Sequence, residues 1–260
     1  MIKTIIHGCN GKMGRTLAAT IEANEGFEVA AGVDAALDAA VDAKSGWDFP
    51  VYGSMAEVQE AADVVIDFSR AEGLDAMVDA AVEKGLAVVV ATTGLSEAQY
   101  AHLREAAARV PIFQAANMSL GVNLLKELVK QAASLLGDAF DIELVEKHHN
   151  TKRDAPSGTA LALADALNEA RGGSMEYVNG RDDKNRLRDK GEIGIHALRG
   201  GNIVGEHDVV FAGQDERLTI SHAAYSKALF TVGALKAAGY IAGKQPGYYH
   251  MEEMIAESIG

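Results

Sequence analysis

Cysteine is almost absent from this chain, since Cys9 is the only one among 260 residues. A single cysteine excludes a disulfide bond within the chain and a cysteine-rich metal site, and we expect no bound metal. Basic side chains are also scarce, because 24 lysines and arginines stand against 37 acidic residues and leave a formal net charge of −13. Such a surface repels phosphate backbones and anionic lipids. We therefore expect neither nucleic acid nor a membrane as a partner, although a local cluster of Lys and His can still bind a small anion.

Long apolar runs, internal repeats and low-complexity linkers are missing as well. No uninterrupted apolar run approaches the roughly 20 residues that a membrane span needs, and the opening MIKTIIHG lacks the layout of a signal peptide. We therefore expect a cytoplasmic protein. The hydrophobic fraction of 48% is that of a folded chain, and 260 residues are enough for one large domain or two modest ones.

In the first half of the chain, short apolar runs alternate with segments of helical periodicity. Strands are predicted at residues 2–7, 27–33, 64–68, 86–91 and 111–114, and helices at residues 12–24, 74–84 and 96–109. Ser96 has the side chain of an N-cap at the start of the last of these helices. Apolar strands separated by helices are typical of a parallel sheet that is covered on both faces.

The second half has a different pattern. Helices are predicted at residues 122–136 and 159–169, a half-exposed strand at 141–147, antiparallel strands at 192–198, 203–211 and 216–222, and a final helix at 230–242. The strands of this half are separated by Gly-rich turns such as the one at 199–202. The whole pattern predicts an N-terminal α/β domain, a mixed α+β insertion and a C-terminal helix.

The first predicted strand leads into the glycine-rich segment GCNGKMG at residues 8–14. Gly8 permits a tight turn, Gly11 lets the backbone approach a pyrophosphate, and Gly14 lets the helix pack on the strand. The N-terminus of the helix offers N–H groups and the positive end of its dipole to phosphates. Asp34 ends the second strand about 20 residues later, where a carboxylate accepts the ribose hydroxyls of an adenosine. The segment predicts a dinucleotide site, although such glycines also occur in plain strand–helix turns.

The residue after Asp34 indicates which nicotinamide cofactor is preferred. Ala35 stands where an arginine would help to hold a 2′-phosphate. We therefore predict NADH as the preferred cofactor, with NADPH as the alternative.

The densest group of reactive side chains is the run EKHHNTKRDAPSGTA at residues 146–160. Histidine titrates near neutral pH and can donate a proton during turnover, and Lys152 can hold an anion or donate a proton. The hydroxyls and backbone N–H groups of Ser157, Gly158 and Thr159 can bind an anion where the helix begins. The run predicts a basic pocket for carboxylates; a solvated charged loop ahead of a capped helix is the alternative.

The individual histidines are expected to differ in role. His148 and His149 point to opposite faces if the strand continues through them. A zinc site is disfavoured here because no third ligand is obvious nearby. His196, His207 and His222 lie on predicted strands, where structural histidines are commoner than ligands.

These segments resemble a known family. The run at 146–160 is similar to the signature E-x-H-H-x-x-K-x-D-x-P-S-G-T-A of the dihydrodipicolinate reductases. The resemblance continues through GCNGKMG at 8–14, DFSRAEG at 67–73, ATTG at 91–94, AANMSLGVN at 115–123, RGGNIVGEH at 199–207 and the ending at 244–251. It therefore spans nearly the whole chain in the right order.

The resemblance implies an α/β fold of two domains. Residues 1–119 plus 230–260 are expected to form a Rossmann-like dinucleotide-binding domain, and residues 120–229 a mixed α+β domain for substrate binding and tetramerisation. The implied activity is the NAD(P)H-dependent reduction of 4-hydroxy-tetrahydrodipicolinate to tetrahydrodipicolinate, with loss of water, in the biosynthesis of diaminopimelate and lysine. The expected partners are this small dicarboxylate and three further copies of the chain in a homotetramer.

The resemblance also assigns roles to residues. His148 matches the proton donor and Lys152 a second catalytic donor. The substrate-binding positions are His149, Ser157, Gly158 and Thr159. The cofactor-binding positions are Gly8, Cys9, Asn10, Gly11, Lys12, Met13, Asp34, Ala91, Thr92, Thr93, Ala115, Ala116, Asn117 and Met118. There are two departures, since Met118 replaces an aromatic of some relatives and Lys227 replaces a frequent arginine, which loses the bidentate fork.

Two other functions are consistent with a dinucleotide-binding fold. An aspartate-dehydrogenase-like oxidoreductase would differ only in its substrate, and it would reduce NAD with aspartate. A nucleotide-sensing regulator would bind NADH without oxidising it.

Overall fold

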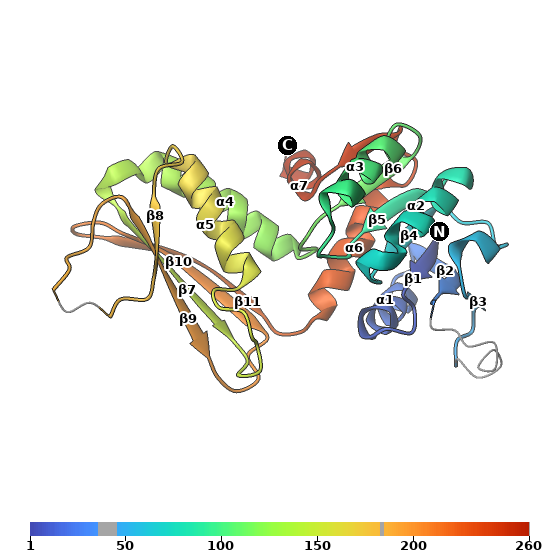
Figure 1. The fold of residues 1–260 in the computed structure, drawn as a ribbon, viewed down its shortest axis with the longest axis horizontal. Coiled ribbons are helices and arrows are strands. Elements are labelled where there is room, and N and C mark those ends of the chain that lie inside the picture. The colour runs from blue at the N-terminus through green and yellow to red at the C-terminus, as the bar shows by residue number, and fades with distance from the viewer. Residues whose placement is uncertain (36–45, 183–184, 260) are drawn as a thin grey trace. The chain divides into compact units, whose positions relative to one another are not determined.

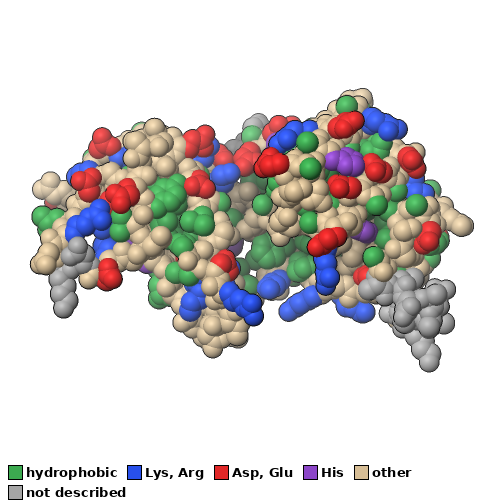
Figure 2. Space-filling model, in the orientation of Figure 1, with side chains coloured by type: hydrophobic (Ala, Val, Ile, Leu, Met, Phe, Trp, Pro, Cys, Tyr) green, Lys and Arg blue, Asp and Glu red, His purple; other side chains and the backbone are tan. Residues whose placement is uncertain are grey.

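The computed structural model of the chain describes residues 1–35, 46–182 and 185–259. The chain divides into two compact units, one built from residues 1–120 and 228–260 and the other from residues 121–227 (Figure 1). Within the described residues, no helix is long and apolar enough to cross a bilayer. On the face drawn in Figure 2, each unit carries acidic and basic side chains scattered among one another.

The first unit is built on a parallel sheet of seven strands among its described residues. In spatial order these are β12 (Gly247–Tyr249), β6 (Pro111–Gln114), β5 (Ala87–Val90), β4 (Val64–Asp67), β1 (Ile2–His7), β2 (Phe27–Val33) and β3 (Val51–Tyr52). From β1 the chain builds outward first through β2 and β3 and then, on the other side, through β4, β5 and β6. This is the doubly wound, Rossmann-like arrangement, and its switch point lies beside β1.

Helices cover both faces of this sheet. One face packs against α1 (Lys12–Glu22), α6 (Ala228–Ile241) and α7 (Met251–Ile259), and the other against α2 (Leu74–Glu83), α3 (Glu97–Ala106) and the short 3-10 helix η1 (Met55–Glu57). The neighbouring residues Ile5 and Ile6 of β1 are both fully buried, one in each of the two resulting cores. The strands therefore show continuous apolar runs instead of alternation. Ser96 caps α3 as predicted, because its hydroxyl accepts a hydrogen bond from the N–H of Gln99.

The second unit is a mixed sheet with helices on one face. In spatial order its described strands are β11 (Arg217–Ala224), β10 (Gly205–Ala212), β7 (Asp141–His148), β9 (Glu192–Arg199) and β8 (Glu176–Asn179). Figure 1 shows α4 (Leu120–Leu136) and α5 (Gly158–Ala170) side by side along this sheet, and their apolar residues share one core with Ile142 and Leu144 of β7. Alternate residues of β7 are buried against these helices, which explains the alternation in its sequence.

Several predicted features of the fold were wrong or incomplete. The strand predicted at 192–198 is not antiparallel to its neighbours, because β9 pairs in parallel with β7 and with β8. Since β7 lies between β9 and β10, the turn at 200–204 carries the chain past the end of β7 and does not close a hairpin. The helix predicted at 230–242 is not the last, because α7 follows it. The short strands β3, β8 and β12 were not predicted, since two to four residues carry too little periodicity.

Candidate active site

The predicted cofactor-binding segments all follow strands of the first sheet. In register, His7 of β1 lies opposite Asp67 of β4, Asp67 opposite Val90 of β5, and Val90 opposite Gln114 of β6. The segments 8–13, 91–93 and 115–118 begin directly after these strand ends. The fold therefore lines them up along one carboxyl edge, where doubly wound sheets bind nucleotides.

The glycine loop has a geometry that only glycine permits. Gly8 has a φ of +84°, and a Cβ on Gly14 would lie 2.2 Å from the carbonyl oxygen of Gly8 and 2.7 Å from the Cα of Cys9. Gly11 is the N-cap of α1 and offers no side chain to the helix, and the first turn of α1 has no acidic residue. The N-terminus of α1 is thus open to an anion, as a pyrophosphate requires.

Asp34 is connected directly to this loop. The backbone N–H of Asn10 donates to Oδ2 of Asp34 over 2.9 Å, and the indole N–H of Trp47 donates to Oδ1 of Asn10 over 3.1 Å. The carboxylate at the end of β2 therefore lies beside the glycine loop, where a ribose would bind. Cys9 is fully buried, and burial, followed by the charge of Asp34, raises the pKa of its thiol to about 11. Its thiol is thus an inert part of the core, and only its backbone is suited to a ligand.

The remaining predicted cofactor residues differ in exposure. Lys12, Thr93 and Ala116 are exposed, whereas Thr92, Ala115 and Met118 are buried, and Met13, Ala91 and Asn117 are intermediate. Met118 belongs to the core beside α6, where a Cβ on Gly233 would meet its carbonyl oxygen. Buried oxygens of Thr92 (Oγ1) and Asp67 (Oδ2) have no hydrogen-bond partner. Unpaired buried oxygens at this edge, together with the open end of α1, fit a polar ligand such as a dinucleotide.

In the second unit, the end of β7 holds a buried carboxylate surrounded by donors. The side chain of Glu146 is fully buried. Arg199 donates to both of its oxygens over 2.7 Å, and the backbone N–H of Ser157 donates to Oε1 over 2.9 Å. Nδ1 of His148 lies 2.6 Å from Oε2. Burial alone would raise the pKa of Glu146, but the hydrogen bonds from Arg199, His148 and Ser157 outweigh it and lower this pKa. Glu146 is therefore a carboxylate at neutral pH.

Ser157 links this group to α5 and to a second histidine. Its hydroxyl caps α5 by accepting from the N–H of Ala160, and it shares a hydrogen bond of 3.1 Å with Nε2 of His207. The rings of His148 and His207 meet edge to face with centroids 5.3 Å apart. Burial lowers the pKa of His207 to about 4, so this imidazole is neutral at physiological pH. His207 was expected to be only structural, yet it contacts two of the predicted site residues.

The other predicted site residues lie in the loop before α5 and in its first turn. His149 pairs through Nδ1 with the hydroxyl of Thr151 over 2.7 Å, and Nζ of Lys152 lies 2.8 Å from Oδ1 of Asp154. Gly158 and Thr159 form the start of α5, whose first turn has no acidic residue. The N-terminal turn of a helix attracts anions. The structure thus joins His148 and Ser157 through Glu146, whereas His149 and Lys152 contact residues of their own loop.

Sequence reasoning missed Glu146, Arg199 and His207 as members of this site. Glu146 and His207 each occupy a buried position in a strand of alternating pattern, and a polar residue at such a position is readily interpreted as structural. The one available signal was position, because Glu146 opens the signature-like run and the segment RGGNIVGEH supplies both Arg199 and His207.

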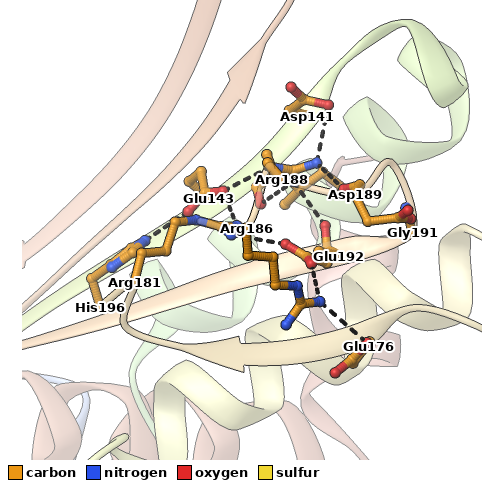
Figure 3. Close-up of polar contacts among 11 residues, drawn as sticks. Asp141, Glu143, Glu176, Arg181, Arg186, Arg188, Asp189, Gly191, Glu192 and His196 are labelled. Atoms are coloured by element: carbon orange, nitrogen blue, oxygen red, sulfur yellow. Dashed lines mark hydrogen bonds and ion pairs between the residues drawn. The ribbon is translucent and has the colours of Figure 1, made fainter. Parts of the chain in front are cut away.

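A similar-looking group lies on the opposite face of β7 and serves a structural role (Figure 3). Glu143 accepts hydrogen bonds from Arg181 and Arg188 and lies 2.6 Å from Nε2 of His196. Arg188 also donates to the backbone oxygens of Ile142 and Glu192. These contacts hold the segment before β9 against the sheet.

Models of the two halves of one family match this chain almost end to end. The model of dihydrodipicolinate reductase, N-terminus, matches residues 2–118, and that of dihydrodipicolinate reductase, C-terminus, matches residues 121–255. A 4-hydroxy-tetrahydrodipicolinate reductase of Caldanaerobacter subterraneus subsp. tengcongensis is 54% identical over 257 residues, which is 98% of this chain and 98% of the relative. The protein of the same name from Clostridium novyi is 42% identical over 255 residues, again 98% of each.

Solved structures show the same fold. The dipicolinate-bound dihydrodipicolinate reductase from Paenisporosarcina sp. TG-14 has a TM-score of 0.79 at 24% identity and covers 96% of this chain and 97% of that chain. A probable dehydrogenase from Thermotoga maritima has a TM-score of 0.61 at 11% identity, with coverages of 97% and 92%. At these identities the likeness concerns the fold alone.

The nucleotide edge and the matched N-terminal model together define the class, which is that of oxidoreductases using a pyridine nucleotide. Because the two family models and the 54% identical relative cover nearly the full length, the chain belongs to the dihydrodipicolinate reductase family.

Proposed function

We propose that this protein reduces 4-hydroxy-tetrahydrodipicolinate to tetrahydrodipicolinate, with loss of water, in the biosynthesis of diaminopimelate and lysine. Two observations support the proposal. His148, nearly buried at the end of β7, is held by Glu146 beside the N-terminus of α5. The two family models match residues 2–118 and 121–255 of the chain. We also propose that the reaction takes place in the cytoplasm.

The substrate is a dicarboxylate, and the second unit offers cationic and N–H groups to it. We assign its carboxylates to His149 and to Ser157, Gly158 and Thr159 in the N-terminal turn of α5. The dipicolinate bound to the Paenisporosarcina relative is a dicarboxylate of this kind. Lys152, now paired with Asp154, exchanges this partner for the substrate. Its assigned role is that of a second proton donor beside His148.

The proton is delivered by His148. Its Nδ1 faces Glu146, so it is the imidazolium form of His148 that carries a second proton on Nε2 and donates it to the substrate ring, which leaves the neutral Nδ1–H form. When bound along residues 8–13, Asp34, 91–93 and 115–118, the pyridine nucleotide supplies the hydride. The chain itself contributes position and charge.

The decisive test compares His148→Gln with the wild type in an assay coupled to the synthase that makes the substrate, following the loss of NADH absorbance. We expect kcat to fall by about 10²- to 10⁴-fold, the typical contribution of a positioned proton donor. His196→Gln is the matched control, because His196 pairs with Glu143 on the same sheet. Equal activity of His148→Gln and the wild type would remove His148 from the mechanism, and an inactive wild type would reject the function.

The cofactor preference is proposed to favour NADH, since Asp34 lies beside the glycine loop and Ala35 carries no charge for a 2′-phosphate. The wild type should show a higher kcat/KM with NADH than with NADPH. Ala35→Arg should raise kcat/KM for NADPH by about tenfold, because a guanidinium binds phosphate in a bidentate way. A large NADPH advantage in the wild type would contradict the assignment.

The quaternary structure is proposed to be a homotetramer built on the sheet face that α4 and α5 leave uncovered. Val145, Leu198 and Val210 supply apolar area on this face, and Leu198 is 47% exposed. Sedimentation equilibrium should give four times the 27.4 kDa of one chain. A monomeric mass at micromolar concentration would reject the tetramer.

A further inference from the structure

The side chain of His148 is held on three sides. Glu146 lies 2.6 Å from Nδ1, and the ring of His207 packs against the imidazole edge to face. Gly205, the first residue of β10, lies on the Nε2 side, since a Cβ built on it would be 3.0 Å from Nε2 and 3.4 Å from Cδ2. The ring therefore has one defined orientation, with Nδ1 toward the carboxylate and Nε2 toward the backbone of Gly205.

The surroundings of Glu146 determine which nitrogen carries the proton. The carboxylate already accepts from Arg199 and from the N–H of Ser157, and as an anion it can only accept from Nδ1. A neutral His148 must then carry its hydrogen on Nδ1 and leave Nε2 as the basic atom. A third group that orients an acid–base histidine in this way is a recurrent arrangement in enzymes.

The backbone conformation at position 205 does not require glycine, because the φ of Gly205 is not positive. Its lack of a side chain matters for another reason. Any Cβ at this position would lie against Nε2, the nitrogen that the proposed reaction uses. The position therefore controls access to the proton donor.

We propose that Glu146 is a positioning residue that fixes the Nδ1–H tautomer of His148, and that Gly205 keeps Nε2 accessible to the substrate. Arg199 and Ser157 complete the arrangement by holding the carboxylate in place. The inference rests on the proposed function for its kinetic consequences, whereas the tautomer is a property of the ligand-free protein.

The first experiment is a ¹⁵N-edited NMR spectrum of histidine side chains in the ligand-free wild type, with His148 assigned from the His148→Gln variant. At a pH where the His148 ring is neutral, we expect Nδ1 to carry the proton and Nε2 to be unprotonated. A wild-type spectrum with the proton on Nε2 would overturn the proposal. This result does not depend on the substrate, so it separates failure of this inference from failure of the proposed function.

The second experiment compares Glu146→Gln with the wild type in the coupled NADH assay across the pH range. We expect kcat to fall by about 10² to 10⁴, as when other orienting carboxylates become amides. The pH dependence of kcat should shift, and the NMR signals of His148 should show a mixture of its two tautomers. Glu143→Gln is the matched control, because it disturbs a Glu–His–Arg group on the same strand without contacting His148. An unchanged pH profile and tautomer in a folded Glu146→Gln variant would refute the positioning role.

Gly205→Ala tests access separately and remains informative if Glu146→Gln fails to fold. We expect at least a tenfold loss of kcat, retention of the Nδ1–H tautomer, and a near-normal dissociation constant for NADH by fluorescence. Full activity of Gly205→Ala would remove the access role.

Discussion

His207 shows at the scale of a single residue how burial controls charge. The residue is 3% exposed, and because burial disfavours the imidazolium its pKa is lowered from 6.5 to about 4. The unfolded chain therefore binds a proton between these values and the folded chain does not. Linkage then makes the free energy of unfolding decrease as the pH falls through this window.

We predict that the wild type loses about 3 kcal/mol of stability between pH 6.5 and pH 4 through this group. His207→Gln, whose amide can still reach Ser157, should lose much less over the same range. Urea denaturation at several pH values measures both. The same acid dependence in variant and wild type would show that His207 is not the titrating group.

Gly14 provides a second test at this scale. Because its Cβ would collide with backbone atoms of Gly8 and Cys9, Gly14→Ala must displace the loop. We expect a loss of about 1–3 kcal/mol in stability and weaker NADH binding, measured by thermal unfolding and by fluorescence titration. Gly53→Ala is the control, since its nearest neighbour is a Glu57 oxygen at an ordinary 3.5 Å. Equal NADH affinity of the wild type and Gly14→Ala would argue against the loop as the phosphate site.

At the scale of elements, the sequence predicted most of what depends on local pattern. The bounds of β1, β2 and β6 agree with the predicted strands, because each is an apolar run bordered by turn residues. The pairing of β9 could not be predicted, because parallel and antiparallel partners demand the same alternation in one strand. The hydrogen bonds from Arg199 to Glu146 could not be predicted either, because the two residues are far apart in the chain and are brought together by the pairing of β7 with β9.

A substitution of Arg188 tests whether this side chain anchors the segment before β9 to the sheet. Its guanidinium donates to Asp141, Glu143 and two backbone oxygens of neighbouring strands, and its side chain is 18% exposed. Arg188→Met should reduce the free energy of unfolding by about 2–3 kcal/mol and increase hydrogen exchange in β9. Lys190→Met is the control, because its exposed 3.5 Å ion pair with Asp141 contributes little. Equal effects of the two substitutions would refute the anchoring role.

At the scale of the whole molecule, the proposed reaction requires one substrate molecule to receive both the proton of His148 and the hydride of the nucleotide. We predict that a crystal structure with NADH and dipicolinate shows Nε2 of His148 within hydrogen-bonding distance of the dicarboxylate, which in turn contacts the nicotinamide. Ligands bound too far apart for transfer would end the reductase proposal.

The strand β7 is hydrogen-bonded to β9 on one side and to β10 on the other. A single inserted residue before Glu146 would turn this acid outward and bring Lys147, which now pairs with Glu206 and Asp208, onto the buried face of the sheet. We therefore expect changes of length within β7 to be far more damaging than insertions outside it, and an insertion scan should show this as a sharp boundary at the two ends of the strand.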